Sequence, residues 1–336
     1  MDSKKIFPIM ATILVLAIVL VGEVIVVTSS HDDYSSSVYV DNDELIFTID
    51  SRNAHEYTAV SLKNSLGLPE TVSVYFDPDY PSAATNGVAS TGARALDEEY
   101  YVQQLSSTLK VRGIDYSEVV DAKGLQNIMS ADGKDHAVIV LSGTLPDTVY
   151  DGSKDSLISK WIESGGRLYW AGGIIGKYIS HRDSLEEVPS GTSIFLGSEC
   201  IGPEFGRALS EVNTNGFHDA LYLQNNKTAY GVVTSELPDD TEYICLGFTD
   251  GERSSATIVS DGNGIICILG GDYSIRQRID LTQLLASGIG PTTELADLVK
   301  GSVHGSENGR LSMGDSVYIT LGGYSPVYCS NLEVKE

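Results

Sequence analysis

The stretch WIESGGRLYWAGGIIGKY, residues 161–178, decides how the rest of the chain is interpreted. An amphipathic helical pattern ends in two glycines, which commonly stop a helix, and the apolar run at 167–171 then has the composition of a buried strand. The strand leads into a glycine-rich turn at 172–175. Many α/β enzymes carry their nucleophile at a turn of this kind. Here the turn contains neither Cys nor Ser, so it has the shape of an active site without a reactive side chain.

Strands and helices alternate on both sides of this stretch. We expect strands at 72–77, 115–120, 137–142, 167–172 and 265–270, and helices at 97–112, 122–130, 155–164 and 280–287. The last helix would begin with Asp280 as its N-cap, and the turn DGNG at 261–264 would join two strands as a hairpin. The alternation is typical of βαβ units, so it predicts an α/β fold over residues 67–292, with a parallel sheet and helices on both faces.

Two segments with strand-like patterns, 38–66 and 293–336, flank this domain. In the first, an Asp-Asn-Asp turn at 41–43 separates two short apolar runs. Because the chain ends of one domain usually lie close together, we expect the two segments to pair in a small sheet or sandwich. The polar segment at 29–37 has no hydrophobic periodicity, and we interpret it as a tether between the anchor and the domain.

The first 28 residues have the pattern of a membrane anchor. The run at 6–27 is almost entirely apolar and is long enough to cross a bilayer as one helix. No small-residue cleavage site follows it, so we favour an uncleaved anchor over a signal peptide. Lys4 and Lys5 precede the run and predict a cytoplasmic N-terminus. The expected location is therefore the cell membrane, with a single pass and with the C-terminal domain outside the cell.

The composition is strongly acidic. The chain has 22 Lys and Arg against 46 Asp and Glu, a formal net charge of −24. Binding to nucleic acid requires Lys and Arg against the phosphates, so the charge argues against a nucleic-acid partner. The sequence has no P-loop, no HExxH motif and no spaced histidine cluster, so it gives no basis for a metal or another cofactor.

A few isolated residues suggest weaker sites. Asp41, Asp43, Asp77 and Asp79 place carboxylates close together and could hold Ca²⁺, but Asp is also an ordinary turn residue, and we favour turns at both places. Asn226 opens the only N-x-S/T sequon, which would lie on the surface if the host glycosylates it.

Four motifs, in this order, resemble the class I glutamine-amidotransferase-like superfamily, and in particular its membrane-anchored, extracytoplasmic branch. They are HAVIVLSGTLPD at 136–147, LISKWIESGGRLYWAGG at 157–173, GIICILGGDYS at 264–274 and DLTQLLASGI at 280–289. The resemblance covers about residues 71–290 and implies a three-layer, flavodoxin-like sheet. It also implies a Cys nucleophile at the turn after 167–171, with a His and a Glu later in the chain. Gly172 and Gly173 stand at that turn, and no His follows the last strand in GGDYSIRQR, so the catalytic triad is absent from its expected places.

Three functions remain open from the sequence. The favoured one is a non-catalytic binding or scaffold module for a protein partner, a glycan or an envelope component, with ligand contacts at Ser142, Gly143, Gly172 and Gly173. An accessory subunit of a membrane transport system would have the same sequence features.

The remaining alternative is an exterior hydrolase or transferase with a relocated nucleophile. Cys200 would attack, and His218 with Asp219 would activate it. A buried or disulfide-bonded Cys200 would count against this alternative.

Overall fold

A computed structural model describes residues 27–31, 33–83, 95–111, 114, 116–171, 173–202, 211–212, 217, 221, 223, 231–270, 275–322 and 328–331. The chain forms two compact units. One is Asn64–Glu294, and the other combines the described residues of Met1–Lys63 and Leu295–Glu336. The first unit is mixed α/β and the second is built from strands.

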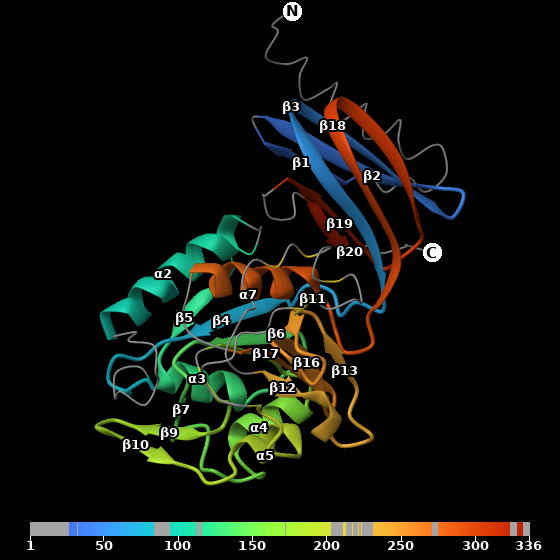
Figure 1. The fold of residues 1–336 in the computed structure, drawn as a ribbon. Helices are drawn as coiled ribbons and strands as arrows, with labels where there is room; N and C mark the ends of the chain where they lie inside the picture. The colour runs from blue at the N-terminus through green and yellow to red at the C-terminus, as the bar shows by residue number, and fades with distance from the viewer. Residues whose placement is uncertain are drawn as a thin grey trace, which may run out of the picture. The chain divides into compact units, whose positions relative to one another are not determined.

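A seven-stranded sheet forms the centre of the α/β unit, in the order β13-β16-β17-β8-β6-β4-β5 (Figure 1). The five strands from β17 to β5 are parallel, whereas β16 and β13 are antiparallel additions at one edge. The four strands predicted at 72–77, 137–142, 167–172 and 265–270 therefore lie in one sheet, as expected. The strands are β4 (Thr71–Tyr75), β5 (Glu118–Val120), β6 (His136–Val140), β8 (Arg167–Ala171), β13 (Tyr243–Cys245), β16 (Ala256–Asp261) and β17 (Gly264–Leu269).

Helices cover both faces of this sheet. One contacting pair is α2 (Ala95–Val111) with α7 (Ile275–Ser287), and the other is α3 (Ala122–Met129) with α4 (Leu157–Glu163). Figure 1 shows the two pairs on opposite sides of β4 and β6. The two tryptophans of the chain, Trp161 of α4 and Trp170 of β8, are among the largest fully buried side chains.

Shorter elements complete this unit. One small sheet has the order β10-β9-β7 and another has the order β11-β14-β15-β12. These elements are β7 (Leu145–Pro146), β9 (Tyr178–His181), β10 (Ser184–Glu187), β11 (Glu211–Val212), β12 (Val232–Val233), β14 (Phe248–Thr249), β15 (Arg253–Ser254), α5 (Thr192–Leu196) and the 3₁₀ helix η2 (Thr234–Glu236).

Two local predictions in this unit have different outcomes. The hairpin at 261–264 is confirmed, because β16 and β17 pair from Asp261 opposite Gly264, and the turn glycine Gly262 has a φ of +59°. Asp280, however, is not a helix cap: α7 already begins at Ile275, and Asp280 lies buried inside it. The residues before Asp280 include Arg and Gln, which favour helix, so the helix extends past the internal capping signal.

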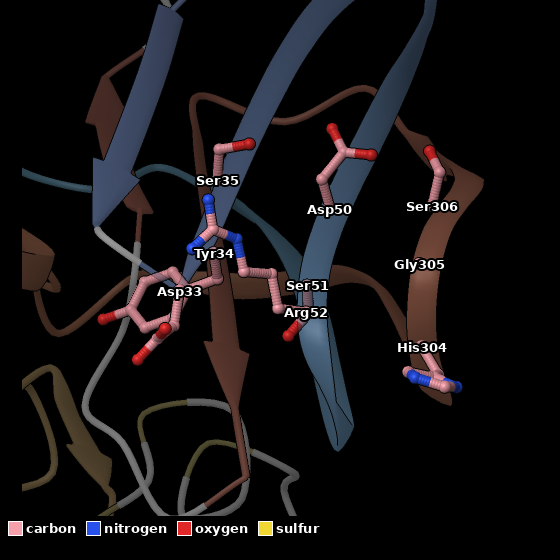
Figure 2. A pocket seen from close by; sticks show the side chains of 9 residues that line it. All are labelled: Asp33, Tyr34, Ser35, Asp50, Ser51, Arg52, His304, Gly305 and Ser306. Atoms are coloured by element: carbon pink, nitrogen blue, oxygen red, sulfur yellow. The ribbon is translucent and has the colours of Figure 1, made fainter.

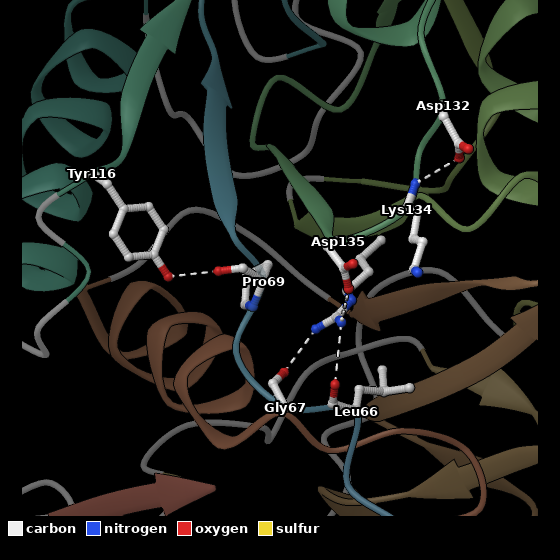
Figure 3. A network of polar contacts seen from close by, with 8 residues as sticks. Leu66, Gly67, Pro69, Tyr116, Asp132, Lys134 and Asp135 are labelled. Atoms are coloured by element: carbon white, nitrogen blue, oxygen red, sulfur yellow. Dashed lines mark hydrogen bonds and ion pairs between the residues drawn. The ribbon is translucent and has the colours of Figure 1, made fainter. Parts of the chain in front are cut away.

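A buried arginine, Arg167, joins the start of the α/β unit to its sheet. Figure 3 shows three of the residues around it, Leu66, Gly67 and Asp135. Arg167, the first residue of β8, donates to the Gly67 carbonyl at 2.7 Å and to the Leu66 carbonyl at 3.2 Å. It also pairs with the Asp135 carboxylate at 3.4 Å. The Leu66 N–H donates to the Gly288 carbonyl after α7. Arg167 therefore fixes the segment through which the chain enters this unit.

The β unit is one curved sheet formed by both ends of the chain. Its strand order is β1-β2-β3-β19-β20, β18 also pairs with β3, and β1 contacts β20. The strand β3 precedes the α/β unit and β19 follows it, and they pair from Ser316 opposite Leu62 to Leu321 opposite Tyr57. The strands are β1 (Val27–His31), β2 (Tyr34–Asp41), β3 (Glu44–Lys63), β18 (Glu294–Ser312), β19 (Ser316–Leu321) and β20 (Tyr328–Asn331).

The long strand β18 folds back on itself. The Ser312 N–H donates to the Asp297 carboxylate at 2.9 Å, although a straight strand would separate these residues by about 50 Å. The midpoint falls at His304 and Gly305, and Gly305 has a φ of +90°, which favours glycine. The orange ribbon of β18 turns back in this region (Figure 1). Its two halves help to enclose a core that contains Phe47 and Val303.

Part of the segment expected to be a tether, 29–37, forms strands instead. Residues 29–31 belong to β1 and residues 34–37 to β2, which pairs along its whole length with β3. The tether interpretation rested on the polar composition and the lack of periodicity, but the backbone of β3 provides hydrogen-bond partners, and Ser36 is buried on the core face. The turn predicted at 41–43 is confirmed, since Asn42 and Asp43 have φ values of +48° and +64° between β2 and β3.

The anchor predicted at 6–27 lies almost wholly outside the described residues, and only Val27 is placed, at the start of β1. Within the ranges that the structure describes, no helix is long and apolar enough to cross a membrane.

Candidate functional site

The turns after β6 and β8 lie next to each other at the carboxyl edge of the parallel strands. A Cβ atom built on Gly173 would be 3.7 Å from the Cα atom of Gly143. Both glycines have positive φ values, +68° at Gly143 and +138° at Gly173. Open α/β sheets bind their ligands at this edge. Three of the four predicted ligand-binding residues, Ser142, Gly143 and Gly173, are thus in neighbouring turns, and Gly172 lies outside the described residues.

The polar groups of these turns bond within the protein. The Gly173 carbonyl accepts a hydrogen bond from the Trp170 indole N–H at 2.7 Å. The Ser142 hydroxyl donates to the Thr144 carbonyl at 2.8 Å, and the Ser142 carbonyl accepts from the Ala83 N–H at 2.9 Å. These bonds hold the turns in place and leave Ser142 buried, so its hydroxyl is not presented to a substrate.

A charged cluster lies on the small sheet that follows. His181, at the end of β9, contacts the Asp147 carboxylate through Nδ1 at 2.8 Å and the Glu186 carboxylate through Nε2 at 3.2 Å. The hydrogen bond to Asp147, followed by that to Glu186, raises the pKa of His181. Because both ring nitrogens face carboxylates, neither is left to take a proton from a nucleophile.

Sequence reasoning did not find this cluster. Asp147 follows β7, His181 ends β9 and Glu186 lies in β10, so only the pairing of the three strands brings them together. A signal was present in the sequence, since His181 and Glu186 are five residues apart around a two-residue hairpin turn.

The relocated nucleophile is not supported by the position of Cys200. Cys200 is a free thiol that is fully buried in the main core of the α/β unit. Burial raises the pKa of the thiol, so the reactive thiolate is disfavoured at neutral pH. His218 and Asp219 lie outside the described residues. The burial of Cys200 counts against this alternative.

The aspartates considered for calcium are used in turns and caps. The Asp77 carboxylate accepts from the Asp79 N–H at 2.9 Å and from the Ala122 N–H, at the start of α3, at 3.0 Å. Asp41 accepts from the Asn42 side chain at 2.9 Å. In the part of the chain that the structure describes, no group of three or more His, Cys, Asp or Glu residues could hold a metal ion. Asn226 lies outside that part.

A pocket of about 230 Å³ lies against α4, α5 and β16 of the same unit. Three carboxylates line it, those of Glu163, Asp240 and Asp261, together with Lys154 and Phe195. Burial, with a further contribution from the Glu163 charge, raises the pKa of Asp261 to about 6. The pocket therefore contains a carboxyl group that titrates close to neutral pH.

Comparison with known proteins gives no family. No protein-family model matches the chain, and a search of curated proteins finds no similar sequence. Among solved structures, an exo-β-1,4-mannosidase from an Opitutaceae bacterium is similar over 66% of this chain, with 12% identity and a TM-score of 0.38. The similar region spans 34% of that protein, about a third of its length. A likeness of this size assigns neither a fold family nor an activity.

Proposed function

We propose that this protein is a non-catalytic binding or scaffold module with an amidotransferase-like, flavodoxin-like α/β domain. Its parallel strands run second, first, third, fourth and fifth across the sheet, which is the order of flavodoxin-like folds. The motifs behind the superfamily resemblance fall on β6, α4, β8, β17 and α7, so they coincide with the strands and helices of one sheet.

The turn after β8 supports a non-catalytic role. A nucleophile turn concentrates backbone strain so that one reactive side chain reaches the substrate. Here Gly173 takes a φ of +138° with no side chain, and its carbonyl is bonded to the buried Trp170. The described residues of the turn, 173–175, therefore carry no reactive side chain, and the thiol of Cys200 is buried elsewhere in the unit.

We therefore expect no glutaminase or esterase turnover from the parent protein or from Gly173→Ala and Gly173→Cys. Ammonia release from glutamine and hydrolysis of p-nitrophenyl acetate measure the two activities. Circular dichroism checks that both variants fold, because a φ of +138° strains any residue with a side chain. Parent turnover that Gly173→Ala abolishes in a folded protein would show that the turn is catalytic.

We further propose that residues 6–27 anchor the chain in the cell membrane and place both described units outside. The support is the apolar run itself and the two lysines before it. The net charge of −24 favours a protein or glycan partner over nucleic acid.

Protease added to intact cells should then degrade the chain after residue 29 and spare an epitope fused at the N-terminus. Permeabilised cells, in which the protease also reaches the cytoplasm, provide the control and should lose both parts. Protection of the two units from protease in intact cells would show that the chain has the opposite orientation in the membrane.

A further inference from the structure

An open groove of about 580 Å³ lies entirely within the β unit (Figure 2). It is formed where the start of β2, the middle of β3 and the turn of β18 run beside one another. The register places Tyr34 opposite Ser51 and Ser35 opposite Asp50, and the Thr48 hydroxyl, which donates to Asn308 at 2.7 Å, holds β18 along the other side of β3. The lining residues are Asp33, Tyr34, Ser35, Asp50, Ser51, Arg52, His304, Gly305 and Ser306.

Gly305 lines the groove where β18 turns. A Cβ atom built there would meet no atom within 4 Å, so this position faces open space. The φ of +90° also disfavours every residue with a side chain. The neighbouring Ser51 is buried and its hydroxyl donates to the Asn53 carbonyl at 2.9 Å, which fixes this part of the floor.

The lining of the groove carries both hydrogen-bond donors and acceptors. Figure 2 shows the Arg52 side chain reaching from β3 towards Tyr34, with His304 on the opposite side of the groove. The guanidinium of Arg52 offers several N–H donors, Asp33 and Asp50 offer carboxylate acceptors, and the serine hydroxyls can do both. A ligand that matches this lining must both donate and accept hydrogen bonds at several points along its length. Vicinal hydroxyl groups of a sugar have this property, and the half-buried Tyr34 adds an apolar ring for a sugar face.

The charge and the shape of the groove restrict the class of ligand further. Two carboxylates face one guanidinium and one imidazole in the groove, and the chain as a whole has a net charge of −24. Such a field repels an anionic polymer such as a polyuronate. The volume lies within the range of small-ligand pockets, and the open form lets a longer chain continue beyond the groove.

We propose that this groove binds a neutral oligosaccharide. The proposal rests on the proposed function as a binding module and names its ligand class. The groove needs no catalytic residue, because binding requires only that hydrogen bonds and ring contact replace those that the sugar makes with water.

The test uses the full chain in nanodiscs and isothermal titration calorimetry with three neutral hexasaccharides, of the β-1,4-glucan, β-1,4-mannan and α-1,4-glucan types. A hexa-uronic acid is the anionic probe. We expect at least one neutral probe to bind and the anionic probe to bind more weakly. Arg52→Met keeps the apolar stem and removes the donors, and Asp50→Ala removes an acceptor. Each should weaken binding by about tenfold.

Arg310→Met is the matched control, because Arg310 is exposed on the same β unit and pairs with Glu44 at 2.8 Å, outside the groove. It should change the affinity by less than about twofold. Equal effects of Arg52→Met and Arg310→Met, a preference for the uronic acid, or no neutral binding would each overturn the groove proposal. None of these outcomes touches the turnover assay at Gly173, so failure of the groove proposal and failure of the proposed function are distinguishable.

Discussion

Replacing Arg167 by methionine is expected to lower the free energy of unfolding of the α/β unit by about 3 kcal/mol. The Arg167 side chain is 8% exposed and makes hydrogen bonds to the carbonyls of Leu66 and Gly67 and to the Asp135 carboxylate. Methionine fills much of the same space but cannot donate, so the two carbonyls lose their partner. The cost comes mainly from the two hydrogen bonds that the buried guanidinium makes, since Leu66 is exposed and Gly67 is half-buried, so water can partly replace the lost donor. The Asp135 pair contributes little of the total, since its carboxylate is 38% exposed.

Urea denaturation followed by tryptophan fluorescence measures this change. Trp161 and Trp170 are the two tryptophans of the chain and both lie in the α/β unit, so the signal reports on that unit alone. Lys134→Met is the control, because Lys134 is exposed beside the same network and should change stability by less than about 0.5 kcal/mol. A loss at Arg167 no larger than that at Lys134 would contradict the assignment of Arg167 as the residue that fixes the entry segment.

Arg167 also shows what the sequence can and cannot predict. The apolar runs of β4, β6, β8 and β17 are local patterns, and strand alternation with helices was enough to place them in one sheet. The partners of Arg167 at Gly67 and Leu66 are 100 and 101 positions away, so no local pattern identifies them. The same limit applies to the tether, whose strands depend on pairing with β3, and to the cluster around His181.

The candidate sites differ in the same way. The sequence alone shows that no Cys or Ser stands at 172–175. Whether Cys200 could act in its place depends on burial, which only the structure shows. The groove of the β unit could not be predicted, because its three sides come from residues 33–35, 50–52 and 304–306. Residues 304–306 reach the other two segments only because β18, far along the chain, lies beside β3.

Gly166→Ala is expected to destabilise the α/β unit by about 3 kcal/mol, for a reason that differs from that at Arg167. A Cβ atom at Gly166 would lie 2.5 Å from the Cδ2 and Cε3 atoms of the Trp161 ring. The ring is 1% exposed and stacks edge-on against His136 at 6.3 Å between ring centres, so a large rigid group must move. The preceding Gly165 has a φ of +122°, which favours glycine. Gly165 is therefore required by the backbone conformation, and Gly166 by the space that the Trp161 ring leaves.

A double-mutant cycle separates this overlap from a general effect of alanine at Gly166. Trp161→Leu removes the six-membered ring that the new Cβ atom would meet, and the buried indole N–H has no hydrogen-bond partner, so its loss leaves no polar group unpaired. In the Trp161→Leu background, Gly166→Ala should cost less than about 1 kcal/mol, measured by urea denaturation with the remaining Trp170 as reporter. An equal cost in both backgrounds would mean that the glycine is required by the backbone at the start of β8 and not by the packing of the Trp161 ring. The smaller cost is expected because the closest atoms to the Gly166 position all belong to that ring.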